Sequence, residues 1–248
     1  MAQQKSTAER VELTSHLTEL RRRLIICLVA VTAGVIISFA FADQLFAILI
    51  KPAGGASLIF VEVTEMLSTY MQVCFIGGIV ISMPVLVYEL IAFVAPALTP
   101  REKRYIFIVL PFIIAMFAGG VLFGYFVLIP PAMNFLLSFG AGIATPQIRI
   151  GNYVTLVSRL LLAIGLVFET PVITTLLARL GILSSGWLLR QWKWAVILAF
   201  VLGAVITPTI DPVNQTLVAA PLILLYLLSI LLAWMVEKKR LPRPSVLQ

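Results

Sequence analysis

Charge is scarce in this sequence: only 12% of its 248 residues are Asp, Glu, Lys or Arg, and 61% are hydrophobic. Soluble domains carry about 25% charged and about 45–50% apolar residues, so a soluble globular fold is excluded. Disorder is excluded for the same reason, because disordered chains are rich in charge and poor in apolar residues. The apolar residues form continuous runs rather than alternating with polar ones, and this pattern predicts membrane-spanning helices.

Residues that usually carry chemistry are also few. The sequence has two cysteines, Cys27 and Cys74, both within apolar runs, and one histidine, His16. This composition offers no disulfide framework and no zinc-binding spacing. The HExxH, GxxxxGK[ST] and GxSxG motifs of metalloproteases, nucleotide-binding loops and serine hydrolases are absent as well. We therefore expect no enzyme activity, no metal and no cofactor.

Six apolar segments can cross a bilayer core about 30 Å thick as helices: 24–41, 66–94, 105–128, 153–180, 192–206 and 216–234. The fifth would rise only about 22 Å, which implies local thinning of the bilayer or a tilted neighbour. The sequence thus predicts an all-α integral membrane protein with six transmembrane helices in a single domain. This domain consists of a cytoplasmic amphipathic segment (1–23), the six helices (24–234) and a basic cytoplasmic tail (235–248).

Lysine and arginine are distributed unevenly over the connections. With the N-terminus in the cytoplasm, 15 of the 18 basic residues lie in cytoplasmic segments, and only Lys51 and Arg149 lie in external ones. The positive-inside rule therefore predicts that both termini are cytoplasmic. The same rule accounts for the net charge of +7 without nucleic-acid binding. The external connections, about 43–65 and 130–151, are long enough to form a cap.

Two acids stand among basic residues at the predicted cytoplasmic face. Glu19 precedes Arg21, Arg22 and Arg23 in a short amphipathic segment that runs into the first span. Its simplest role is an i,i+4 pair with Arg23, and the arginines themselves suit anionic lipid headgroups. Glu102 lies in the connection after the second span. Together the two carboxylates can bind guanidinium groups, since each can accept a bidentate pair.

Several residues within or near the spans have both a structural and a functional interpretation. Glu169 is predicted near mid-membrane, where an acid is costly and is a functional candidate, or else a hydrogen-bonded core acid. Pro171 frees a backbone carbonyl and bends that helix. Glu89 can snorkel to the cytoplasmic interface, and Asp211 suits an external Asp-Pro turn. The pair Gly120 and Gly124 favours close helix packing within the chain over dimerisation.

Four segments, in this order, resemble the TatC family, the polytopic core subunit of the twin-arginine translocase. None is specific alone, but on six spans of this polarity they are specific together. The segments are Ser15-His16-Leu17-Thr18-Glu19-Leu20-Arg21-Arg22-Arg23-Leu24, Phe93-Val94-Ala95-Pro96-Ala97-Leu98 followed by Glu102-Lys103-Arg104, Phe168-Glu169-Thr170-Pro171, and Thr207-Pro208 followed by Asp211.

The resemblance implies a fold and a function. The implied fold is a curved wall of six helices with an external cap over a concave groove, in the cell inner membrane. The implied function is recognition of paired-arginine signal peptides on folded cargo, and export driven by the proton-motive force together with single-span TatA- and TatB-like partners. Self-association in a larger complex is implied as well. Glu169 matches an intramembrane acid linked to partner contacts. The residues assigned to signal-peptide binding are Glu19, Phe93, Glu102, Arg21 and Arg23.

Two features leave part of this interpretation open. Leu227 in the last span replaces an acid found in some members of the family, which argues against a charged partner contact there. The alternative function is a proton-coupled secondary transporter that uses Glu169 as its proton site. Such carriers usually contain inverted repeats and broken helices around a midplane pocket, and we find no convincing inverted repeat in the sequence.

Overall fold

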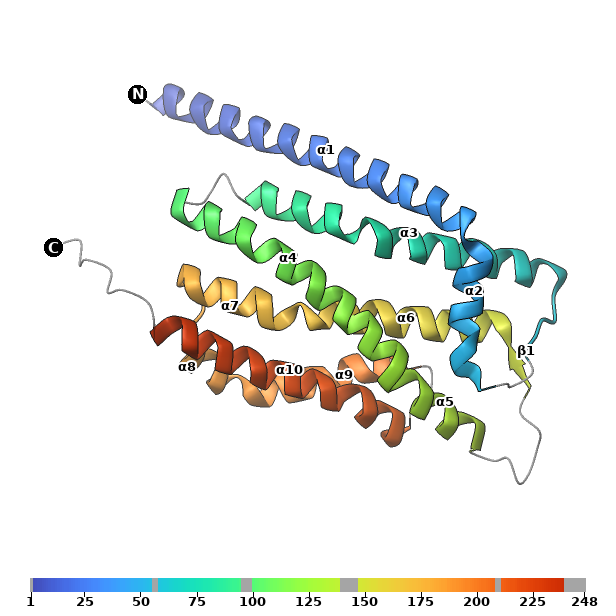
Figure 1. Cartoon of the computed structure of the whole chain (residues 1–248). Helices are drawn as coiled ribbons and strands as arrows, with labels where there is room; N and C mark the ends of the chain where they lie inside the picture. The colour runs from blue at the N-terminus through green and yellow to red at the C-terminus, as the bar shows by residue number, and fades with distance from the viewer. Residues whose placement is uncertain (1, 55–57, 95–99, 139–146, 208–210, 239–248) are drawn as a thin grey trace. The chain divides into compact units, whose positions relative to one another are not determined.

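The computed structural model describes residues 2–54, 58–94, 100–138, 147–207 and 211–238, without the side chains of 2–16, 94 and 100–106 (Figure 1). Helices account for nearly all of the described chain. In chain order the elements are α1 (Ala2–Ala40), α2 (Ala42–Ile50), the 3₁₀ turn η1 (Lys51–Ala53), β1 (Leu58–Ile59), α3 (Val63–Val94), α4 (Pro100–Phe123), the π-helical turn η3 (Gly124–Leu128), α5 (Ile129–Ser138), β2 (Ile148–Arg149), α6 (Ile150–Phe168), α7 (Thr170–Leu180), α8 (Ser185–Arg190), α9 (Trp192–Ile206) and α10 (Pro212–Lys238).

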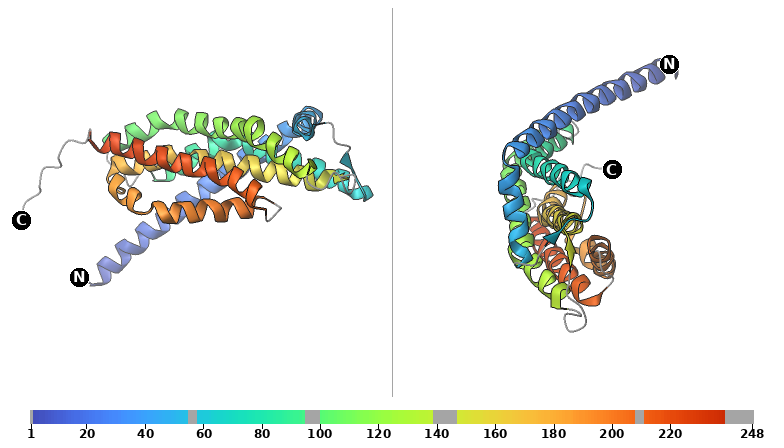
Figure 2. Two further views of the ribbon diagram at one scale, coloured as in Figure 1. Left: turned by 90° about the horizontal axis from the view of Figure 1, so that it is seen from below. Right: turned by 90° about the vertical axis from the view of Figure 1, so that its right-hand side faces the viewer.

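The chain divides into two compact units, which are described separately. The first unit comprises Met1–Ala47 and Tyr70–Ile114, and so contains α1, most of α2 and α3, and the first part of α4. The second comprises Ile48–Thr69 and Ala115–Gln248. Within it, α10 packs along α7 and α9 (Figure 2), and the Tyr226 hydroxyl of α10 donates to the Leu188 carbonyl of α8 at 2.7 Å.

Five helical stretches of the described chain are long and apolar enough to cross a membrane: Leu17–Ala40, Val63–Phe93, Phe107–Ser138, Ile150–Leu180 and Pro212–Lys238. The sixth predicted span coincides with α9, which is apolar but has only 15 residues. Large apolar side chains such as Leu28, Trp194 and Leu224 are more than half exposed, as expected for helices that a bilayer covers. The prediction of an all-α membrane protein is confirmed.

The predicted amphipathic segment at the N-terminus is not a separate helix. It forms one continuous helix with the first span, because no proline or glycine interrupts the chain before Gly34.

Both predicted external connections contain more helix than expected. The first includes α2, and the second begins with α5, although Pro130 and Pro131 stand in its first turn. The π-helical turn η3 precedes these prolines, and its last bond joins the Ile129 amide to the Gly124 carbonyl. This turn resets the hydrogen-bond ladder ahead of the prolines, so the helix continues.

A cluster around Glu65 joins these two connections within the second unit. Strands β1 and β2 pair in parallel, Leu58 with Ile148 and Ile59 with Arg149. The buried Glu65 carboxylate accepts hydrogen bonds from the Val61 amide at 2.9 Å, the Arg149 guanidinium at 3.0 Å and the Gly151 amide at 3.2 Å. The hydrogen bond to Glu65 raises the pKa of Arg149, so this side chain stays charged.

Replacing Glu65 by alanine is expected to lower the midpoint of thermal unfolding by several degrees, because two buried amides and a guanidinium lose their acceptor. The matched control is Glu62→Ala. Glu62 also faces Arg149, but at 3.4 Å and with 69% of its side chain exposed, so its removal should change little. Thermal unfolding of the purified proteins in detergent measures both effects. Equal midpoints for the two variants would contradict a structural role for Glu65.

The predicted close packing at Gly120 and Gly124 occurs within the chain. A Cβ atom at Gly120 would lie 2.7 Å from the Phe168 side chain and 2.9 Å from the Gly165 Cα. At Gly124 the nearest atom, on Leu161, would lie at 3.2 Å. Helices α4 and α6 therefore approach each other closely here, as small residues permit in membrane proteins.

Gly120→Ala should destabilise the protein by about 1–3 kcal/mol, the usual cost of overpacking. Its neighbour Gly119 is the matched control, because a Cβ there meets nothing within 4 Å. Gly119→Ala should be neutral or slightly stabilising, since alanine favours helix. Thermal unfolding in detergent compares the two variants, and equal stability would show that α4 and α6 can separate at no cost.

Candidate functional site

Arg23 connects two carboxylates in the first unit. Its Nε and Nη2 atoms donate to Oε1 of Glu19 at 3.1 and 2.6 Å, and its Nη1 donates to Oε2 of Glu89 at 3.0 Å. The i,i+4 pair expected from the sequence is therefore present, and the same arginine also links α1 to α3. The side chain of Glu89 is only 9% exposed. A buried carboxylate requires such a partner, because an unpaired buried charge is strongly destabilising.

Glu19 keeps part of its hydrogen-bonding capacity. Both contacts from Arg23 use Oε1, and Oε2 has no partner among the residues that the structure describes. One third of the side chain remains exposed. Arg23 thus holds the Glu19 carboxylate in place and leaves one oxygen available to a further donor.

The other residues assigned to the cytoplasmic face are placed less completely. Phe93 lies one helical turn after Glu89 on α3 and is half-buried. Arg21 is exposed on α1. Glu102 lies in the first turn of α4, but its side chain is outside the described part of the chain. The structure therefore brings Glu19, Arg23 and Glu89 together in direct contact, and it does not show how Glu102 is oriented.

Glu169 lies at the junction of α6 and α7 in the second unit, where the helix is broken just before Pro171, as expected. The Glu169 amide donates to the Leu166 carbonyl at 3.2 Å, and its carbonyl accepts from the Val172 and Ile173 amides at 3.1 and 2.9 Å. The side chain is buried, with the whole residue only 6% exposed. Its Oε1 atom has no hydrogen-bond partner in the described residues, so the site has a polar atom that a further donor or acceptor would satisfy.

Asp211 begins α10. Its Oδ1 accepts from the Asn214 amide at 2.7 Å and its Oδ2 accepts from the Asn214 side chain at 3.1 Å. This is an N-cap, and Pro212 follows it at the first helical position, where proline is favoured.

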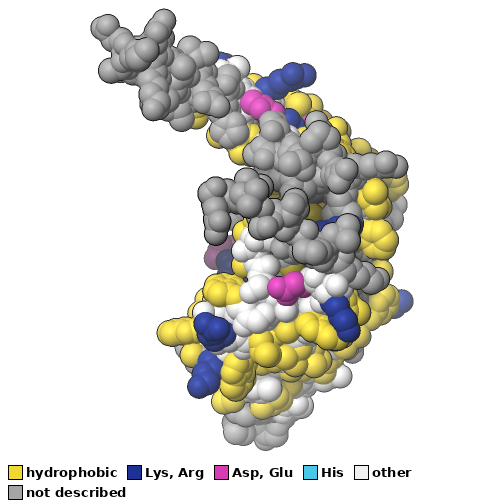
Figure 3. All heavy atoms as spheres, turned by 90° about the vertical axis from the view of Figure 1, so that its left-hand side faces the viewer, with side chains coloured by type: hydrophobic (Ala, Val, Ile, Leu, Met, Phe, Trp, Pro, Cys, Tyr) yellow, Lys and Arg dark blue, Asp and Glu magenta, His cyan; other side chains and the backbone are white. Residues whose placement is uncertain are grey.

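Basic residues gather at one end of the second unit, where α7, α8 and α10 end. Their last turns carry Arg179, Arg190 and Lys238. Figure 3 shows Lys and Arg side chains on this face among hydrophobic ones. Glu237 caps α8 here, because its Oε2 accepts from the Ser185 amide at 3.0 Å and from the Ser185 hydroxyl at 2.5 Å.

The long apolar helices define a multi-pass membrane protein, and no group of three or more metal-ligating side chains occurs among the described residues. Residues 15–221 match the family model described as Sec-independent protein translocase protein (TatC). The chain belongs to the TatC family.

Relatives align over almost the whole chain. The Sec-independent protein translocase protein TatC of Carboxydothermus hydrogenoformans is 38% identical over 229 residues, which cover 92% of this chain and 94% of the relative. The protein of the same name from Aquifex aeolicus is 37% identical over 234 residues, 92% of this chain and 97% of the relative. The chloroplastic relative of Arabidopsis thaliana is 37% identical over 224 residues, 90% of this chain and 65% of the relative.

Solved structures described as the twin arginine translocase receptor TatC share the fold. One superimposes with a TM-score of 0.79 at 36% identity and covers 89% of this chain and 99% of the other. A second, in the detergent DDM, gives 0.81 at 38% identity and covers 88% and 99%. This protein is thus a multi-pass component of the Sec-independent translocase of the cell membrane, with a role in a Tat complex, and not an enzyme. This assignment replaces the alternative of a proton-coupled transporter.

Proposed function

We propose that this protein binds the paired-arginine signal peptides of folded cargo at the cytoplasmic end of α1, α3 and α4. The observation that carries the proposal is the Glu19 carboxylate, which Arg23 holds through one oxygen while the other is unpaired. The solved relatives described as twin arginine translocase receptors support the same role.

Recognition follows from guanidinium chemistry. A carboxylate accepts an arginine through charge-assisted, often bidentate, hydrogen bonds, so Glu19 and Glu102 would each receive one arginine of the pair. Phe93 presents an aromatic ring on which a guanidinium can stack. Arg23 positions Glu19, and the exposed Arg21 can donate to the peptide or to lipid phosphates.

The proposal extends to partners within the membrane. Single-span TatA- and TatB-like proteins would contact the second unit at Glu169, where a polar atom is buried and unpaired. Together with further copies of this chain they would form the complex that moves folded cargo, driven by the proton-motive force.

The experiment that tests recognition compares two signal peptides that differ only at the paired arginines. The purified protein in detergent should bind the twin-arginine peptide at least about tenfold more tightly than its twin-lysine counterpart, because lysine cannot form the bidentate contact. Fluorescence anisotropy gives both dissociation constants. Equal affinity for the two peptides would exclude guanidinium recognition.

Both termini and the start of α4 are proposed to face the cytoplasm, on the distribution of basic residues. Single-cysteine labelling in intact cells checks this orientation, in a background without Cys27 and Cys74. A cysteine at position 145 should react with an impermeant reagent without lysis. Labelling at that position only after lysis would reverse the orientation.

A further inference from the structure

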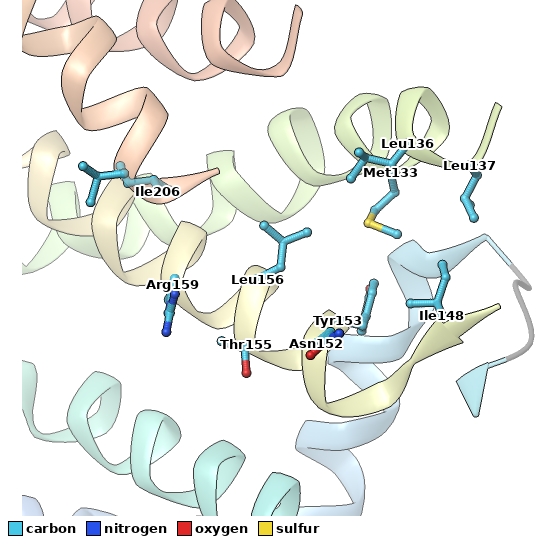
Figure 4. Close-up of a pocket in the computed structure, with 11 residues that line it drawn as sticks. Met133, Leu136, Leu137, Ile148, Asn152, Tyr153, Thr155, Leu156, Arg159 and Ile206 are labelled. Atoms are coloured by element: carbon cyan, nitrogen blue, oxygen red, sulfur yellow. The ribbon is translucent and has the colours of Figure 1, made fainter. Parts of the chain in front are cut away.

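A cavity of about 530 Å³ opens in the second unit between α5, β2, α6 and the end of α9 (Figure 4). Its apolar wall includes Met133 and Leu136 of α5, Leu156 of α6 and Ile206 of α9. The volume lies within the range of about 300–1,000 Å³ that is usual for ligand sites. Neither signal-peptide binding nor the Glu169 contact uses this cavity.

One wall of the cavity is polar. Asn152, Thr155 and Arg159 follow one another on α6 at i, i+3 and i+7, and Figure 4 shows them in a row along this helix. Arg159 is exposed, and no residue of the described chain forms a hydrogen bond or an ion pair with it. None of the residues that line the cavity is acidic, so a counter-ion for Arg159 must come from a ligand.

The depth of Arg159 makes that counter-ion important. The residue lies nine positions after Ile150, the first residue of α6, which is about 13.5 Å along a helix at 1.5 Å per residue. It falls within the apolar stretch Ile150–Leu180. A guanidinium at this depth is costly unless it reaches an anion or the polar interface. Asn152 and Thr155 supply polar groups between Arg159 and the start of α6.

We propose that this cavity binds an anionic phospholipid, with the lipid phosphate on Arg159 and part of an acyl chain on the apolar wall. The planar guanidinium has five N–H donors in a fork that matches two phosphate oxygens. The Met133, Leu136 and Leu156 side chains provide the surface that an acyl chain covers. A lipid is the ligand that brings both parts together, and the apolar helices around the cavity place it in contact with the bilayer.

Native mass spectrometry of the purified protein, titrated with phosphatidylglycerol or phosphatidylcholine, tests the proposal. The wild-type protein should bind phosphatidylglycerol at least tenfold more tightly. Arg159→Gln should reduce phosphatidylglycerol binding to the phosphatidylcholine level, and Arg159→Lys should retain part of it. Arg190→Gln is the matched control, because Arg190 is exposed on α8 and does not line the cavity; it should bind as the wild type does.

Two further arms keep the outcome decisive. Leu156→Trp fills the cavity and keeps the arginine, and should also weaken phosphatidylglycerol binding at least tenfold. Inorganic phosphate at millimolar concentration should not displace the lipid; full displacement would make this a site for free phosphate. Equal binding of both lipids, or wild-type phosphatidylglycerol binding in Arg159→Gln, would overturn the proposal. Signal-peptide affinity should be unchanged in all these variants, so the two proposals fail separately.

Discussion

Glu102→Lys is expected to abolish binding of paired-arginine signal peptides while leaving membrane insertion intact, and Glu19→Lys is expected to do so to a lesser degree. A hydrogen bond to a charged group contributes about 1.5–3 kcal/mol, which corresponds to roughly 10- to 150-fold in affinity. A lysine at either position also repels the incoming arginines. The smaller effect at Glu19 fits its position beside Arg23, which already shares this carboxylate.

The measurement is peptide affinity in detergent, where no partner protein is present. Glu62→Lys is the control, because it makes the same change of charge at an exposed acid of the second unit, and it should bind peptide as the wild type does. Glu19→Gln separates loss of charge from repulsion, and should lie between wild type and Glu19→Lys. Unchanged affinity in Glu102→Lys would remove Glu102 from the recognition site.

The sequence was sufficient for the features that depend on short-range patterns. Long apolar runs located the helices, the i,i+4 spacing gave the Glu19–Arg23 pair, and Pro171 marked the break beside Glu169. These features depend on residues one or two helical turns apart, where helical geometry fixes the distance. The sequence therefore predicted most of the secondary structure and the local part of the candidate site.

Features that join distant segments were missed. Arg149 and Glu65 are 84 residues apart and Arg23 and Glu89 are 66 apart, so no periodicity connects them. Glu89 was interpreted as a snorkelling acid, whereas it is buried against Arg23. The helix through Pro130 was also missed, because its continuation depends on the π-helical turn before it. An acid in the first turn of a long apolar helix was the one signal for Glu65.

Glu169→Ala should sharply impair cargo export and partner assembly, while Glu169→Gln should retain appreciable export. The buried carboxyl has an unpaired oxygen, and a polar residue on a partner's otherwise apolar helix can hydrogen-bond with it. Glutamine has the same length and can both donate and accept, so it preserves this contact. Alanine removes it and leaves the partner's polar group unsatisfied, at a cost of about 1–3 kcal/mol, or roughly 5- to 150-fold in assembly.

Three measurements on the same variants decide what Glu169 does: export of a folded reporter, co-purification of TatA- and TatB-like partners, and signal-peptide affinity. Signal-peptide affinity should stay unchanged, because Glu169 and Glu19 belong to different compact units, and Glu62→Ala should be unaffected in all three. Export at the wild-type level in Glu169→Ala would reduce this residue to a tolerated core acid. Loss of export as severe in Gln as in Ala, with partners still bound, would instead require a carboxyl that exchanges protons, because glutamine keeps the hydrogen bonds and lacks only the titration.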